Sequence, residues 1–142
     1  MIFWDSSAIV PLCVSEPATS KVKSILAKDP LTVVWWATRT ECISALLRQT
    51  REGSLTSAGE RQARDLLEAL ASAWIEIQPT GNLRGTAERL LAVHPLRAAD
   101  AFQLAAALQW CRGQTAGMSI VSFDDRLRDA AHKEGFNLLP PE

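Results

Sequence analysis

Apolar residues along the chain fall into two patterns that follow each other almost throughout. Short runs rich in β-branched and aromatic residues are typical of strands, whereas apolar residues that recur at helical spacing are typical of amphipathic helices. The predicted strands cover residues 2–4, 31–36, 74–79, 117–123 and 136–139. The predicted helices cover residues 18–27, 38–51, 56–72, 83–93, 98–110 and 125–134.

This alternation of strands and helices predicts an α/β fold with a central parallel sheet flanked by helices. Two helices, at 38–51 and 56–72, follow each other without a strand between them, so we expect a helical hairpin that projects from the sheet. Pro11 limits any helix over residues 8–12 to a brief turn. At 142 residues, the chain is predicted to form a single domain over residues 1–142.

Composition and charge narrow the class of protein only slightly. Hydrophobic residues make up 47% of the chain and charged residues 22%, which is ordinary for a globular protein. The formal net charge is −1, so no basic excess points to nucleic acid. The three cysteines have no zinc-type spacing, and the apolar stretches fall short of the roughly 20 residues of a membrane helix. We therefore expect a cytoplasmic protein without a membrane partner.

Four acidic residues occupy similar places relative to the predicted elements. Asp5 and Asp124 directly follow predicted strands, and Glu41 and Asp100 lie at the starts of predicted helices. The carboxyl ends of parallel strands share one edge of the sheet, where ligands bind. We therefore expect the four carboxylates to converge in one pocket that suits a hard divalent cation such as Mg²⁺.

Helix capping offers a simpler explanation for each acid taken alone. Asp5, Asp100 and Asp124 could each cap a helix, and Glu41 could form a capping box with Thr38. The joint pattern favours metal binding, because an acid entering a helix as apolar as 98–110 is costly to bury unless it is paired or bound to metal.

Neighbouring residues are compatible with a phosphodiester substrate. Ser6 and Ser122 could hydrogen-bond the carboxylates or a phosphate oxygen, and Arg97 could contact a phosphate. Asp125 is expected to face outward as a first-turn acid of its helix. We interpret the tryptophan pair at 35–36 as part of an interior strand rather than as a platform on which bases stack.

Four segments in order resemble motifs of the PIN-domain family, in particular the VapC-type toxins of bacterial toxin–antitoxin pairs. The opening "IFWDSSAIVPLCVSEPAT" is similar to the first motif, and "TRTECISALLRQTREG" to the second. The segment "HPLRAADAFQLAAAL" is similar to the third motif, and "SIVSFDDRLRDAAHKEGF" to the fourth. Together these segments cover nearly the whole chain.

The resemblance implies a Mg²⁺- or Mn²⁺-dependent ribonuclease in which a metal-activated water attacks an RNA phosphodiester in line. The family acids fall on Asp5, Glu41, Asp100 and Asp124, with the "SFD" segment favouring Asp124 over Asp125 as the fourth. Ser6 and Ser122 match hydroxyl residues of the motifs. Homodimerisation is also implied, as is a small VapB-type antitoxin whose C-terminal segment fills the acidic groove, gripped by the hairpin of residues 38–72.

Two other classes of protein remain open at this point. The chain could be a PIN-fold binding module without catalytic activity, although the presence of all four acids argues against a loss of catalysis. It could also be a phosphotransfer or phosphatase domain, which would need a lysine beside the acids. The four lysines lie in or directly after predicted helices, away from the expected acidic edge.

Overall fold

The computed structural model describes all 142 residues and contains one five-stranded sheet and seven helices. The strands are β1 (Ile2–Trp4), β2 (Thr32–Trp35), β3 (Ile75–Ile77), β4 (Ser119–Val121) and β5 (Asn137–Leu139). The helices are α1 (Ser6–Cys13), α2 (Thr19–Lys28), α3 (Thr38–Arg51), α4 (Ser57–Ala71), α5 (Gly81–Val93), α6 (Ala98–Trp110) and α7 (Asp125–Lys133).

All neighbouring strands pair in parallel, in the order β3-β2-β1-β4-β5, which confirms the predicted fold class. The chain steps outward from β1 to β2 and β3, and then returns to the other side of β1 to add β4 and β5. Phe3 of the central strand is paired with Val33 on one side and Ile120 on the other. The direction of winding therefore reverses between β1 and β4, and in open α/β sheets ligands bind at such a reversal.

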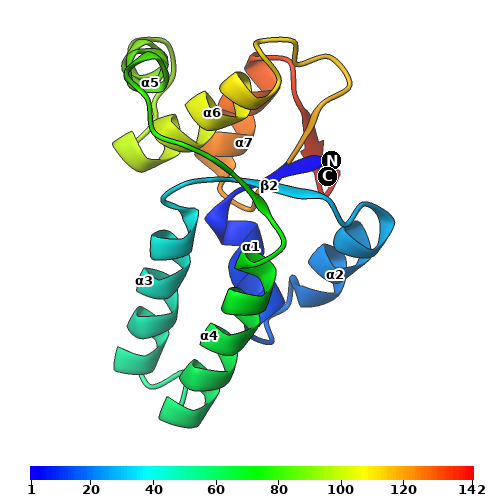
Figure 1. Cartoon of the computed structure of the whole chain (residues 1–142), viewed down its shortest axis with the longest axis vertical. Helices are drawn as coiled ribbons and strands as arrows, with labels where there is room; N and C mark the ends of the chain where they lie inside the picture. Colours follow the sequence, from blue (N-terminus) through cyan, green and yellow to red (C-terminus); the bar gives the residue numbers. More distant parts are fainter.

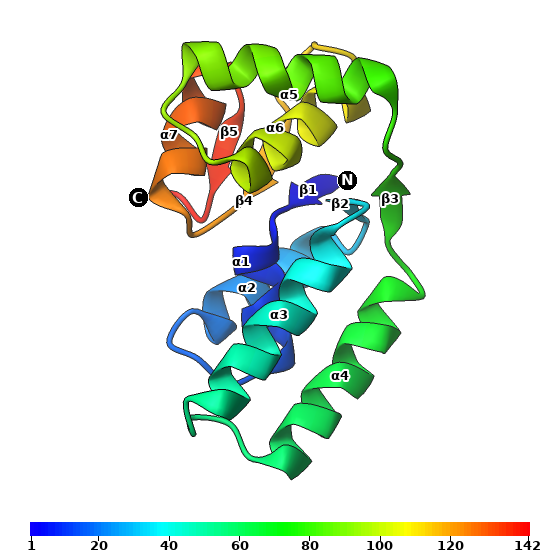
Figure 2. The same ribbon diagram turned by 90° about the vertical axis from the view of Figure 1, so that its left-hand side faces the viewer.

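The sheet separates two layers of helices, as Figures 1 and 2 show: α1 to α4 lie on one side, and α5, α6 and α7 on the other. Successive strand residues point to opposite faces, so each strand contributes to both cores. Phe3 and Ile120 pack into the core with α5, α6 and α7, whereas Trp4 and Val121 pack against the helices of the other layer.

The predicted helical hairpin is present. In Figure 2, α3 runs away from the sheet and α4 returns alongside it. Cys42 and Leu46 of α3, together with Ala63 and Leu67 of α4, are buried in the same core cluster as α1. The hairpin is thus held to the body of the molecule by its apolar stripe.

Two local predictions were wrong. Residues 6–13 form a helix with Pro11 inside it, rather than a brief turn, because burial of Ala8, Ile9 and Val10 outweighs the hydrogen bond that proline cannot donate. Trp36, predicted as part of an interior strand, lies just beyond β2 with 52% of its surface exposed, whereas Trp35 is buried.

None of the helices is both long enough and apolar enough to span a membrane.

Candidate active site

Asp5 lies directly after β1 at the carboxyl edge of the sheet and is only 4% exposed. Its Oδ2 accepts hydrogen bonds from Ser7 Oγ at 2.6 Å and from Ser122 Oγ at 2.9 Å. Ser6 Oγ lies 3.4 Å from Oδ1, which is a long contact. Asp5 is the N-cap residue of α1, but its side chain makes no capping hydrogen bond, so capping does not explain this acid.

Hydroxyl groups join the end of β1 to the end of β4. Ser122 is fully buried, and its Oγ accepts from the backbone N–H of Asp124 at 3.1 Å. Ser7 Oγ accepts from the backbone N–H of Phe123 at 2.9 Å. The two serines therefore fix the Asp5 carboxylate relative to the turn that leads into α7.

Asp124 caps α7, since its Oδ1 accepts from the Leu127 N–H at 2.9 Å. The capping explanation is therefore correct for this residue. It involves only one carboxylate oxygen, and no hydrogen bond from the protein reaches the other. Asp125 is exposed in the first turn of α7, as expected.

Glu41 lies in the first turn of α3 and faces α6 across the edge of the sheet. Its Oε1 accepts from Gln103 Nε2 at 2.6 Å, and the same amide nitrogen donates to Thr38 Oγ1 at 3.0 Å. The N-cap residue of α3 is Ala37, without a side-chain cap, so the capping box with Thr38 that offered a simpler explanation of Glu41 does not form. Gln103 instead holds Glu41 in place from the neighbouring helix.

Asp100 lies in the first turn of α6, three residues before Gln103 and hence on the same helical face. Arg97 is the exposed N-cap residue of this helix and makes no side-chain hydrogen bond. Its positive charge nevertheless acts to lower the pKa of Asp100, against the effect of burial. Arg97 therefore lies at the border of the acidic cluster rather than inside it.

The four acids influence one another electrostatically. Burial raises the pKa of Asp5, hydrogen bonds from Ser7 and Ser122 lower it, and the charge of Asp124 raises it again. Burial also raises the pKa of Glu41 to about 7, opposed by the Gln103 hydrogen bond and reinforced by Asp5 and Asp100. The pKa of Asp100 is raised by burial and by the charges of Asp124 and Asp5. The pKa of each of these three acids is thus shifted partly by the charge of another member of the set.

The donor set of this edge consists of carboxylate and hydroxyl oxygens, which suits a hard cation such as Mg²⁺ or Mn²⁺. No three of the acidic, histidine and cysteine side chains are placed so that they could share one ion. Carboxylates repel one another when no cation lies between them. Their side chains would have to rotate toward a cation for several of them to bind it together. The buried Asp5 is suited to bind a divalent cation, because the cation would stabilise the charged form of its carboxylate.

Sequence reasoning missed two residues of this site, Ser7 and Gln103. Gln103 is the one polar residue in the apolar stretch 101–108, and it is only 1% exposed. A polar side chain buried in such a helix requires a hydrogen-bonding partner, and this is the signal that could have identified it. Ser7 carries no comparable signal, since serine is common at helix starts.

The PIN-domain family profile matches residues 2–133, so the chain belongs to the PIN-domain family. Among solved structures, the chain is similar to the sarcin–ricin-loop-cleaving toxin VapC20 of Mycobacterium tuberculosis, with 19% identity and a TM-score of 0.69 over 96% of this chain and 97% of that one. FitAcB of Neisseria gonorrhoeae is 15% identical, with a TM-score of 0.68 over 97% and 96%.

A third similar structure is VapBC2 of Rickettsia felis bound to a promoter DNA fragment, at 12% identity and a TM-score of 0.65 over 97% of both chains. No curated protein matches the chain in sequence. At these identities the solved structures establish the fold, and they agree with the sequence resemblance to VapC-type proteins.

Proposed function

We propose that the chain is a Mg²⁺- or Mn²⁺-dependent endoribonuclease and the toxin of a VapBC-type toxin–antitoxin pair. The observation that carries this proposal is the set of four interacting carboxylates at the carboxyl edge of the sheet, around the point where the winding reverses. A cluster of this kind suits a metal-dependent nuclease, because carboxylate oxygens can hold the divalent cations that allow an anionic phosphodiester to approach.

In this proposal Asp5, Glu41 and Asp100 hold the cation or cations, and Asp124 contributes directly or through water. A bound divalent cation would lower the pKa of the attacking water and neutralise charge that develops on the phosphate. The carboxylates serve as ligands in their charged forms, so their raised pKa values mean that cation binding displaces protons.

The remaining residues of the site position these ligands. Ser7 and Ser122 both donate to Oδ2 of Asp5, which fixes the plane of the carboxylate. Gln103 does the same for Glu41. We assign Ser6 to the substrate side of the site, and Arg97 to contact with a phosphate of the RNA because its guanidinium is exposed beside Asp100. Ser122 is fully buried, so it positions Asp5 and does not contact the substrate as the sequence suggested.

The toxin assignment is supported by the resemblance of four segments to VapC-type proteins and by the fold shared with VapC20 and the VapBC2 complex. A VapB-type antitoxin is the expected partner, with the α3–α4 hairpin as the place where it is gripped. We also propose that the chain forms a homodimer and acts in the cytoplasm.

The direct test is RNA cleavage by the purified chain free of antitoxin. We expect cleavage in Mg²⁺ or Mn²⁺ and none in EDTA. Asp5→Asn should reduce the rate at least about 100-fold, because it removes a charged ligand while preserving the shape of the side chain. Asp125→Asn removes an exposed acid next to the site and is the matched control, with activity near that of the unmodified chain.

Cleavage that persists in EDTA would contradict the metal mechanism. A chain that binds Mn²⁺ but cleaves no RNA would favour the alternative of a catalytically silent PIN-fold binding module. Mapping the 5′ ends of RNA after induced expression, with Asp5→Asn beside it, would identify the substrate in the same experiment.

A further inference from the structure

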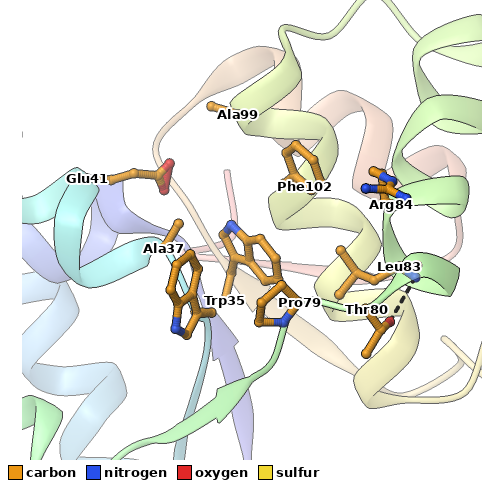
Figure 3. A pocket seen from close by; sticks show the side chains of 11 residues that line it. Trp35, Ala37, Glu41, Pro79, Thr80, Leu83, Arg84, Ala99 and Phe102 are labelled. Atoms are coloured by element: carbon orange, nitrogen blue, oxygen red, sulfur yellow. Dashed lines mark hydrogen bonds between the residues drawn. The ribbon is translucent and has the colours of Figure 1, made fainter.

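An apolar cavity of about 670 Å³ opens beside the acidic cluster and shares Glu41 with it. A cavity of this volume is in the range of sites that bind small organic groups. Figure 3 shows Glu41 and Ala99 at one side of the cavity and Arg84 at the other, with Phe102 between them in this view. Nothing in the proposed metal chemistry uses the apolar part of this cavity.

Three aromatic side chains, Trp35, Trp36 and Phe102, line the cavity. Trp35 stacks on Phe102, with the ring planes 2° apart and the centroids 5.5 Å apart. Trp36 meets Trp35 edge-on at 6.3 Å and keeps 52% of its surface exposed. Trp36 therefore presents a large, exposed aromatic ring at the cavity, on which a ligand can stack.

Arg84 supplies the positive charge of the cavity. It is exposed on α5 and takes part in none of the chain's ion pairs. The cavity is thus bordered by a carboxylate of the metal site at one side and by a free guanidinium at the other. This arrangement of charges is complementary to a nucleotide strand, with one phosphate at the metal site and a further phosphate at Arg84.

From these observations we propose that the cavity binds the base of the nucleotide next to the scissile phosphate of single-stranded RNA. The base stacks on Trp36, and Arg84 contacts the phosphate beyond it. Two features favour a nucleobase over another apolar group. The cavity includes Glu41 of the proposed metal site, so a base joined to a phosphodiester at that site lies next to it, and every base has a π-face that an aromatic ring can accept. The inference rests on the proposed ribonuclease function and adds a subsite to it.

The test uses cleavage kinetics of a single-stranded oligoribonucleotide, intact or with the base removed from one nucleotide flanking the cut. Trp36→Leu keeps apolar bulk but removes the ring, and should raise KM about 5- to 100-fold with kcat little changed. Trp36→Phe should recover most of this loss. Removing the flanking base should raise KM for the unmodified chain to a similar extent, and should add little for Trp36→Leu.

Arg84→Ala should also raise KM, whereas Arg89→Ala, which removes the same charge from an exposed position of the same helix, should not. If Trp36→Leu and the unmodified chain cleave intact and base-free RNA with the same KM, the subsite is refuted although the ribonuclease stands. If no RNA is cleaved at all, the proposed function fails. The subsite is then tested by measuring binding of the labelled oligonucleotide by anisotropy in Ca²⁺. Equal affinities of the unmodified chain and Trp36→Leu would refute it.

A second copy of this chain is the competing occupant of the cavity. Sedimentation equilibrium of Trp36→Leu distinguishes the two cases. Conversion of a dimer to monomers without any change in RNA affinity would overturn the base subsite in favour of an interface between copies, whereas weaker RNA binding at an unchanged oligomeric state supports the subsite.

Discussion

Asp5 and Glu41 are carboxyl groups whose charged forms are disfavoured by burial and by the charges around them. In their charged forms these two groups destabilise the folded chain. A nucleic-acid phosphate cannot approach them either, unless cations intervene. Strongly shifted pKa values of this kind are common where titratable groups serve a function. The proposed cation would stabilise the charged forms of both carboxylates.

The raised pKa of Glu41 predicts how the stability of the metal-free chain depends on pH. Its folded-state pKa is about 7, against a model value of 4.5, so the folded state binds the proton more tightly than the unfolded state. This contribution to stability is fully present below about pH 4.5 and is lost as the pH rises through about 7. Glu41→Gln cannot titrate, so it should not show this loss. Between pH 4.5 and pH 8, its free energy of unfolding should rise by about 1–2 kcal/mol relative to that of the unmodified chain, after allowance for solvent screening.

Urea unfolding in EDTA at both pH values measures this difference. Glu52→Gln is the matched control, since it neutralises an exposed glutamate at the end of the same helix, outside the acidic cluster. A stability difference between Glu41→Gln and the unmodified chain that is the same at pH 4.5 and pH 8 would contradict the environment described for Glu41.

At the residue level, the sequence indicated the four acids as candidate ligands, but it did not show which side chains hydrogen-bond them. Position after a strand or at a helix start is visible in the sequence, and it was enough to select Asp5, Glu41, Asp100 and Asp124. Hydrogen bonds between distant segments are not visible there. Gln103 reaches Glu41 across 62 positions of the chain, and Ser122 reaches Asp5 across 117.

Among the elements, the α3–α4 hairpin owes its position to an apolar stripe on each helix. Leu67 of α4 is 2% exposed and lies in the core cluster shared with α1 and α3, whereas its neighbour Leu66 is 44% exposed. Two adjacent leucines of one helix thus differ almost completely in burial, and they provide an internal comparison.

Leu67→Ala should lower the free energy of unfolding by about 2–5 kcal/mol, because it removes buried methyl groups and leaves a cavity. Leu66→Ala should change it by no more than about 0.5 kcal/mol, as expected for an exposed position. Urea unfolding of the two variants measures both values. Equal losses of stability would show that the hairpin does not pack through the face described.

Most helices and strands were predicted within one or two residues, because their apolar periodicity coincides with the faces that the sheet buries. The exceptions have physical causes. The propensity of Pro11 argued for a turn, yet packing of the surrounding residues against the sheet keeps α1 helical. The run ending in two tryptophans suggested an interior strand, but β2 ends at Trp35 and leaves Trp36 in the open.

At the scale of the whole molecule, the winding order creates the site. Because β4 returns beside β1, residues from both ends of the chain meet at one edge, and α3 and α6 bring Glu41 and Asp100 to it from opposite layers of helices. The sequence predicted a parallel sheet but not this strand order. It predicted a common edge for the acids without showing that the central strand carries the first of them.

The most direct test of the central claim, that the four carboxylates form one divalent-cation site, is thermal unfolding with and without Mn²⁺. A cation that binds only the folded chain adds about 2.7 kcal/mol at 100 times its Kd, which corresponds to a rise in Tm of about 5–10 °C. The unmodified chain and Asp125→Asn should both show this rise, and Asp100→Asn should lose most of it. An unchanged Tm for the unmodified chain, or an equal rise in all three proteins, would contradict the claim.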